Sequence, residues 1–236
     1  MPATLQGAPV TNSTGGTEVT SVTFAATVAA GTDTCMAVCV GAEGNGAGGI
    51  SVSSITFNGD ALTFHDEISN GTWSFSEVWQ RIAPDVATGN VVVTMSAADK
   101  WVTGVYVANG VDQTTPLRAV AESTATGTSV SNTVAGVGTD DLVFDSLAID
   151  STSHAGTVGA DQTERWDIEI ASGYVTGLSS TQAGSAGGVM SWTWTGSNPY
   201  SHVATAFVAA AAALPFLYPP VGFSQLPQRH RGAVAY

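Results

Sequence analysis

Short runs of β-type residues, separated by turn residues, recur roughly every eight to twelve residues along most of this chain. The clearest turn is Asn58-Gly59 in ITFNGDALTF, a dipeptide that favours the positive φ angles of a two-residue type I′ hairpin. No stretch competes with these runs as an amphipathic helix. The pattern indicates an all-β protein, a single antiparallel β-sandwich of the jelly-roll type. Strands are predicted over residues 18–28, 34–40, 51–57, 61–65, 72–82, 90–96, 101–108, 129–134, 142–149, 164–170, 174–182, 189–195 and 202–210.

Alternating aromatic residues indicate which strand faces point into the core. In TWSFSEVWQRI, the side chains of Trp73, Phe75 and Trp79 fall on one side of a strand. Trp192 and Trp194 share a side in the same way in VMSWTWTGS. Large apolar surface is normally buried, so both sets are predicted to be core rather than a platform for sugar binding.

The sequence carries no sign of secretion or of a membrane span. Cys35 and Cys39 lie in the apolar run TCMAVCVGA, where four residues of strand separate them by about 13 Å, beyond the reach of a disulfide. We expect two free, buried thiols. The first residues lack the basic and apolar regions of a secretory signal. The apolar run at 203–218 is alanine-rich, broken by a proline and too short to cross a bilayer.

Charge is distributed unevenly along the chain. All 19 acidic residues lie between Glu18 and Glu169, and the formal net charge is −13. Residues 1–169 carry four basic side chains, a net charge of −15, whereas residues 170–236 carry only Arg229 and Arg231. An acidic body with a basic end attracts copies of itself or another acidic shell protein and repels nucleic acid and anionic membranes. Neither a nucleic-acid nor a membrane partner is expected.

No motif for a cofactor or a metal is convincing. The glycines of GAEGNGAGG have the GxGxxG spacing of a dinucleotide site, but a strand-like run follows where that site needs a helix. The four histidines are scattered, with no HExxH, DxDxDG or GxSxG pattern. Asp140 and Asp141 are interpreted as a solvated strand start rather than a calcium site. No cofactor and no metal site are expected.

The segment ERWDIEI is the one place where a glycosidase pair deserves a test. Asp167 and Glu169 fall on one strand face, as in the E-x-D-x-E arrangement of jelly-roll glucanases. Arg165 occupies the position of the first glutamate in that arrangement, and Glu164 is expected on the opposite face. The sequence therefore places no two carboxylates at catalytic separation. A salt-bridged exposed face is the preferred interpretation. No catalytic residue is assigned, and the chain is not expected to be an enzyme.

The last stretch, residues 214–236, differs from everything before it. It holds four prolines, which prevent a long helix or a central strand, together with several aromatic side chains and two arginines. Fully extended, it reaches roughly 75 Å. We interpret it as an arm that docks on a neighbouring subunit; a tail folded back on its own domain is the alternative. The residues expected to contact a partner are Pro215, Phe216, Tyr218, Phe223, Arg229, Arg231 and Tyr236.

From about Ile55 to Phe207 the order of elements resembles β-sandwich domains of tailed-phage virions and related bacterial surface proteins. The segments that carry the resemblance are ITFNGDALTF, SEVWQRIAPDVATGNVVVTMS, VYVANGVDQTTPL, DDLVFDSLAI and GVMSWTWTGSNPYSHVATAFV. A strand ending in GVDQxxP recurs in such domains, where it marks a structural turn. Here Asp112 and its threonines are expected to cap that turn, and Pro116 prevents continuation as a central strand.

These observations predict an N-terminal segment over residues 1–16, a β-sandwich domain over 17–213 and an arm over 214–236. The resemblance implies a bacteriophage virion protein of the capsid cement or decoration type, located on the capsid surface. Its partners would be a major capsid or other shell protein and copies of itself, in a homo-oligomer. The alternative is a carbohydrate- or receptor-binding module of a phage tail fibre or bacterial surface protein, because such sandwiches occur in all these roles.

Overall fold

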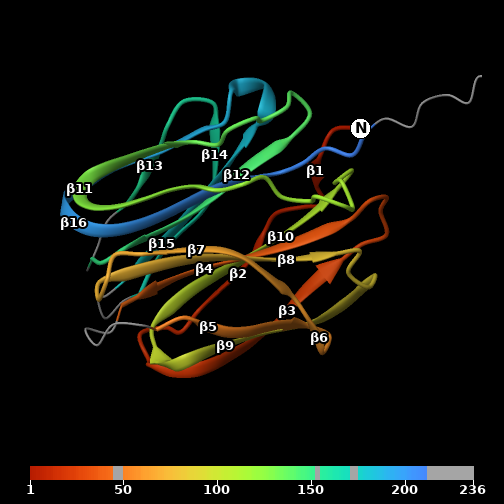
Figure 1. Ribbon diagram of the computed structural model, residues 1–236. Coiled ribbons are helices and arrows are strands. Elements are labelled where there is room, and N and C mark those ends of the chain that lie inside the picture. Colours follow the sequence, from red (N-terminus) through yellow and green to blue (C-terminus); the bar gives the residue numbers. More distant parts are fainter. Residues whose placement is uncertain (45–49, 152–154, 171–174, 212–236) are drawn as a thin grey trace, which may run out of the picture.

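The computed structural model describes residues 1–44, 50–151, 155–170 and 175–211 (Figure 1). These residues form an all-β fold in which every strand pair is antiparallel, so the predicted β-sandwich is confirmed. One short 3-10 helix spans Gly184–Ala186. The strands are β1 (Thr4–Leu5), β2 (Val10–Ser13), β3 (Val19–Val28), β4 (Cys35–Glu43), β5 (Val52–Phe57), β6 (Asp60–Ala61), β7 (Thr63–Ser69), β8 (Ser74–Ile82), β9 (Ala87–Asp99), β10 (Trp101–Asn109), β11 (Ala121–Thr133), β12 (Leu142–Ile149), β13 (Thr157–Val158), β14 (Gln162–Glu169), β15 (Thr176–Ala183) and β16 (Val189–Phe207).

Three sheets are stacked, and the middle sheet shares a core with each of the other two (Figure 1). The middle sheet has the order β1-β10-β4-β8-β7, with β2 also paired to β10. A four-stranded sheet, β3-β9-β5-β6, covers one of its faces. The third sheet, called here the outer sheet, has the order β11-β16-β12-β15-β14, with β13 paired to β16, and covers the other face.

Strand β4 lies at the centre of this stack and is apolar on both faces. Cys35, Ala37 and Cys39 belong to the core shared with the outer sheet, whereas Met36 and Val38 belong to the core shared with the four-stranded sheet. Residues 35–42 are all buried. An unbroken apolar run, in place of alternation, therefore indicates a strand covered on both sides.

Residues 1–16, predicted as a separate N-terminal segment, contribute two edge strands to the middle sheet. Thr4 and Leu5 of β1 pair with the end of β10, and β2 pairs with residues 102–105 of the same strand. Ala3 is buried in the core shared with the outer sheet. This part of the chain therefore packs as part of the body.

The predicted Asn58-Gly59 hairpin is confirmed. Phe57 pairs with Asp60, and the φ angles of Asn58 and Gly59 are 55° and 91°. The second strand of this hairpin, β6, is only two residues long. The chain then leaves the four-stranded sheet, and β7 pairs with β8 in the middle sheet. The strand expected over residues 61–65 is thus divided between two sheets.

The two aromatic sets have different outcomes. Trp192 and Trp194 are buried together in one cluster, as predicted. Phe75 and Trp79 are also buried, but Trp73 is 56% exposed, so its assignment to the core is wrong. Trp73 precedes β8 and lies in the turn after Gly71, where the strand alternation does not yet apply.

The thiols of Cys35 and Cys39 are free and buried, as predicted. Burial raises the pKa of Cys35 to about 12 and that of Cys39 further still, so neither forms a thiolate at neutral pH. A thiol reagent should therefore react slowly with the folded chain and should titrate two thiols per chain in denaturant without reductant. An intrachain disulfide found by mass spectrometry would contradict the assignment of β4.

Candidate partner-binding site

The residues predicted to contact a partner all lie beyond residue 211 and therefore outside the described residues. The structure does describe the place where this segment leaves the body. Val208 donates its backbone N–H to the carbonyl of Pro116 at 2.9 Å, and Ala210 donates to Gly110 at 2.7 Å. Ala209 forms an isolated antiparallel bridge with Val111. The exit segment, residues 208–211, is thus held along the GVDQTTP turn.

The turn itself has the predicted cap. Asp112 Oδ1 accepts the backbone N–H groups of Thr114 and Thr115, each at 2.8 Å, and these bonds hold the pKa of Asp112 below its usual value. Gly110 adopts a φ of 69°, and a side chain there would approach the carbonyl oxygen of Pro2 to 2.6 Å. The sequence motif therefore organises the exit of the chain as well as the end of β10.

A partly buried ion pair, formed just before β12 of the outer sheet, anchors the same segment. Asp141 Oδ2 accepts hydrogen bonds from Arg118 Nε at 2.7 Å and from the backbone of Gly138 at 2.8 Å, while Oδ1 accepts from Ala209 at 2.8 Å. The side chain of Asp141 is 3% exposed, so the prediction of a solvated strand start is wrong for it, although Asp140 is exposed. No group of residues able to hold a metal was found among the described residues.

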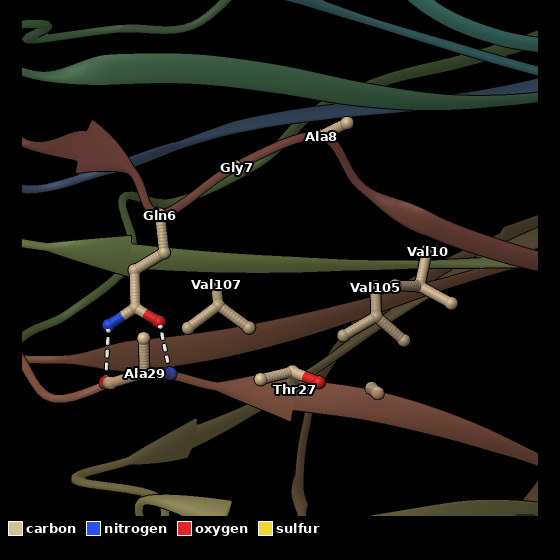
Figure 2. A pocket seen from close by; sticks show the side chains of 9 residues that line it. Gln6, Gly7, Ala8, Val10, Thr27, Ala29, Val105 and Val107 are labelled. Carbon is tan, nitrogen blue, oxygen red and sulfur yellow. Dashed lines mark hydrogen bonds between the residues drawn. The ribbon is translucent and has the colours of Figure 1, made fainter. Parts of the chain in front are cut away.

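A groove of about 190 Å³ opens close to this exit, between the middle sheet and the four-stranded sheet (Figure 2). Its floor is apolar and consists of Ala26 from β3 with Val105 and Val107 from β10. Its rim is formed by Gln6, Gly7, Ala8 and Val10 on one side and by Thr27 and Ala29 on the other. None of these lining side chains carries a charge.

One residue closes the end of the groove. Gln6 Nε2 donates to the carbonyl of Ala29 at 2.9 Å, and the Ala29 N–H donates to Gln6 Oε1 at 2.8 Å, as the dashed lines in Figure 2 show. The side-chain amide thereby imitates a strand pair just beyond the end of β3. Gln6 also donates to Asn109 Oδ1 at 2.8 Å, next to Gly110 of the exit. Asn109 contacts the groove residue Gln6, and the next residue, Gly110, contacts the exit segment. The groove and the exit segment therefore lie close together at the end of β10.

A second hollow, of about 350 Å³, lies beside β1 and differs in character. Its lining includes Asp140, Asp141 and Arg165 as well as Pro2 and Ala183. Charged groups make this hollow a poorer fit for an uncharged apolar segment than the groove.

The face predicted for Glu164 in ERWDIEI is wrong: Glu164 pairs with Ser180 and Asp167 with Leu178, two positions apart on β15, so these two carboxylates share a face. A β-bulge interrupts the pairing of β14 with β15 between Glu164 and Trp166, so Arg165 is the extra residue. Arg165 Nε donates to Thr181 Oγ1 at 2.7 Å, and Asp167 Oδ2 accepts from the backbone of Gly156 at 2.9 Å. Among the described residues Arg165 forms no ion pair, so the expected salt bridge is not found there.

The structure brings together one polar cluster that the sequence did not reveal. Asp145 and His202 are 0% exposed, and Asp145 Oδ2 lies 3.1 Å from His202 Nε2 and 2.6 Å from Trp192 Nε1. Asn132 Nδ2 donates to His202 Nδ1 at 2.9 Å, so Nε2 carries the proton that points to Asp145. Asp145 Oδ1 accepts from the backbone and hydroxyl of Ser180. The cluster is buried and forms a hydrogen-bonded network inside the outer sheet.

Like charges gather where β7 and β11, edge strands of different sheets, approach one another. Burial and the neighbouring Asp66 carboxylate raise the pKa of Glu122. Glu67, next to Asp66, pairs directly with Glu77 of β8. The body thus presents carboxylates of the kind that arginine side chains bind.

The described residues contain no helix long and apolar enough to cross a membrane. Comparison with known proteins found no matching family model, no matching curated protein and no matching solved structure. The resemblance to virion β-sandwiches therefore stays a prediction from the sequence. The all-β fold and its anchored exit segment are the structural observations from which a function can be proposed.

Proposed function

We propose that this chain is a structural subunit of a virus particle, a capsid cement or decoration protein that binds neighbouring subunits through its C-terminal arm. The observation that carries the proposal is the anchored exit, where a turn, a partly buried ion pair and the end of β16 hold residues 208–211. A segment attached at one defined point loses less freedom on docking than one on a loose linker. The arm supplies apolar anchors such as Phe216 and Phe223.

Charge supports the same proposal. Residues 1–169 carry a net −15, and the arm carries Arg229 and Arg231 without any acidic residue. Arginine pairs with carboxylates through two parallel hydrogen bonds, and acidic copies of this chain or another acidic shell protein offer such groups. The proposal includes a capsid-surface location, a homo-oligomer and a major shell protein as partner, with neither catalysis nor nucleic-acid binding.

Deleting residues 214–236 should abolish self-association or particle binding while leaving the body folded. The described body has three sheets, and the middle sheet shares a core with each of the other two, so the shortened chain should keep a β-type circular dichroism spectrum and unfold cooperatively. Light scattering on the purified chain and its copy ratio to the major shell protein in intact particles are the measurements. Arg229→Ala with Arg231→Ala should give a milder defect that shrinks as salt is raised, because salt screens the arginine contacts of the parent chain and leaves apolar burial unchanged.

Full assembly of the shortened chain would overturn the proposal. A different result would favour the carbohydrate-binding alternative: glycan binding that is lost in Trp73→Ala, since Trp73 is exposed and free of the core clusters. Measurable turnover of a bacterial surface polysaccharide, lost in Glu169→Gln, would instead favour an enzyme.

A further inference from the structure

We propose that the groove between β10 and β3 binds residues 214–223 of a neighbouring copy. This inference rests on the proposed function, because that proposal supplies the neighbour, and it adds the surface that receives the arm. The argument starts from the chemistry of the two parts. Residues 214–223 read LPFLYPPVGF and carry no charge. The groove has a floor of Ala26, Val105 and Val107 and no charged lining residue.

The groove is also open in the way that an extended segment requires. In the four-stranded sheet, β3 pairs with β9 on one side and with no strand of the described residues on the other. On the opposite wall, Val10 pairs with Val105 and Gln6 donates its N–H to Val107, so the residues between them stand away from β10. An open strand edge and an uneven wall leave room for a guest chain along the groove.

The prolines of the arm suit a groove better than a sheet edge. Pro215, Pro219 and Pro220 have no backbone donor, so a regular ladder along β3 would be interrupted at three positions. A proline-rich segment keeps an extended shape before it binds, and side chains such as Phe216 then supply most of the contact area. We therefore expect docking through side chains in the apolar floor.

The position of the exit favours this groove as the docking site, and charge favours its use between copies. Ala210, near the last described residue before the arm, is bound to Gly110, and Gln6 of the groove is bound to the neighbouring Asn109. Two bodies of net −15 repel each other over most of their surface, whereas the uncharged groove lets them meet without opposing carboxylates.

Cross-linking between full-length chains tests the groove directly. One chain carries Ala8→Cys at the exposed rim, the other carries Leu217→Cys in the arm, and the two are mixed with a short bismaleimide. Both native cysteines are buried, so they stay unreactive. We expect cross-linked dimers that contain one chain of each kind. The matched control carries Val86→Cys in place of Ala8→Cys, because Val86 is 64% exposed and lies outside the groove. It should give at most about a tenth as much cross-linked dimer.

A charge in the groove gives a second readout. Val10→Asp should weaken self-association at least about tenfold, because a carboxylate would be buried against apolar side chains, whereas Val86→Asp should leave it unchanged. Val10 is 37% exposed, and circular dichroism shows whether the variant folds; Ala8→Asp serves if it does not.

The outcomes separate the two proposals. Absence of the Ala8–Leu217 cross-link, with loss of assembly on deletion of residues 214–236, overturns the groove and leaves the proposed function standing. Cross-links confined to single chains, seen when Ala8→Cys and Leu217→Cys are combined, overturn exchange between copies and with it the proposed function. Assembly of the deletion variant overturns both.

Discussion

Replacing Asp145 with alanine should lower the free energy of unfolding by about 3–5 kcal/mol, a large part of the stability of an ordinary domain. The carboxylate accepts hydrogen bonds from Trp192 Nε1, His202 Nε2 and the backbone of Ser180, all in the interior. Alanine leaves these donors buried without an acceptor, and each such group costs about 1–3 kcal/mol. Asp145→Asn should also be destabilising, because the amide nitrogen would face a donor.

Urea unfolding followed by tryptophan fluorescence measures this loss. Asp140→Asn is the matched control, since Asp140 is an exposed carboxylate of the same region, and its effect should stay within about 0.5 kcal/mol. Asn132→Ala should weaken the protein less, because it removes one donor to His202 and leaves Asp145 with all its own donors. A loss below about 1 kcal/mol for Asp145→Ala would show that the network does not hold the outer sheet together.

Stability should fall as the pH rises from about 5 to about 8, because two buried carboxyl groups prefer their protonated form. Burial raises the pKa of Glu77 from 4.5 to about 7, and the neighbouring Glu67 adds to the effect. Burial likewise raises the pKa of Asp99 from 3.8 to about 7, with further increases from Glu43 and Glu18. The folded chain therefore holds protons that the unfolded chain has already lost.

The sign and size of this effect follow from linkage. A group whose pKa is raised on folding contributes stability that is complete below its unfolded pKa and lost as the pH passes its folded pKa. Each of the two carboxyls should account for about 2–3 kcal/mol of the loss between pH 5 and pH 8. His65, whose pKa is lowered by burial, acts in the opposite direction over part of this range, so variants are needed to isolate each carboxyl.

Asp99→Asn gives the sharpest test. Asp99 Oδ1 accepts the N–H of Lys100 at 2.7 Å, and Oδ2 is buried with no hydrogen-bond partner among the described residues. Asparagine keeps the accepting oxygen and stays uncharged, so the variant should be more stable than the parent at pH 8 and nearly equal at pH 5. Urea unfolding across this range is the measurement, with Asp85→Asn as an exposed control. A parent whose stability rises steadily to pH 8 would contradict the assignment of both groups.

Much of the fold could be predicted from local patterns. The Asn58-Gly59 turn, the buried pair Trp192 and Trp194, and the unpaired thiols are all as expected, because turn chemistry and the two-residue period of a strand act within a few residues. Where the pattern is weak, prediction failed. The first half of β11 was missed because none of its side chains is buried and the segment shows no apolar alternation.

Other features required the tertiary structure. The structure has three sheets where two were expected. An apolar run such as β4 indicates that both faces of the strand are buried, but it does not indicate which sheets cover them. The groove could not be predicted, because it exists only once β2 pairs with β10 and the side-chain amide of Gln6 bonds to Ala29. The arm residues, by contrast, were conspicuous in the sequence and lie outside the described residues.

The sequence by itself determined the all-β class, the main hairpin, the burial of the tryptophan pair and the charge contrast between body and arm, because each depends on composition or on neighbouring residues. Only the tertiary structure decided which distant groups meet. Asp145 and His202 are 57 positions apart and come together because β12 and β16 pair in one register. A shift of one residue would turn these side chains to opposite faces of the sheet, and no local pattern specifies that register.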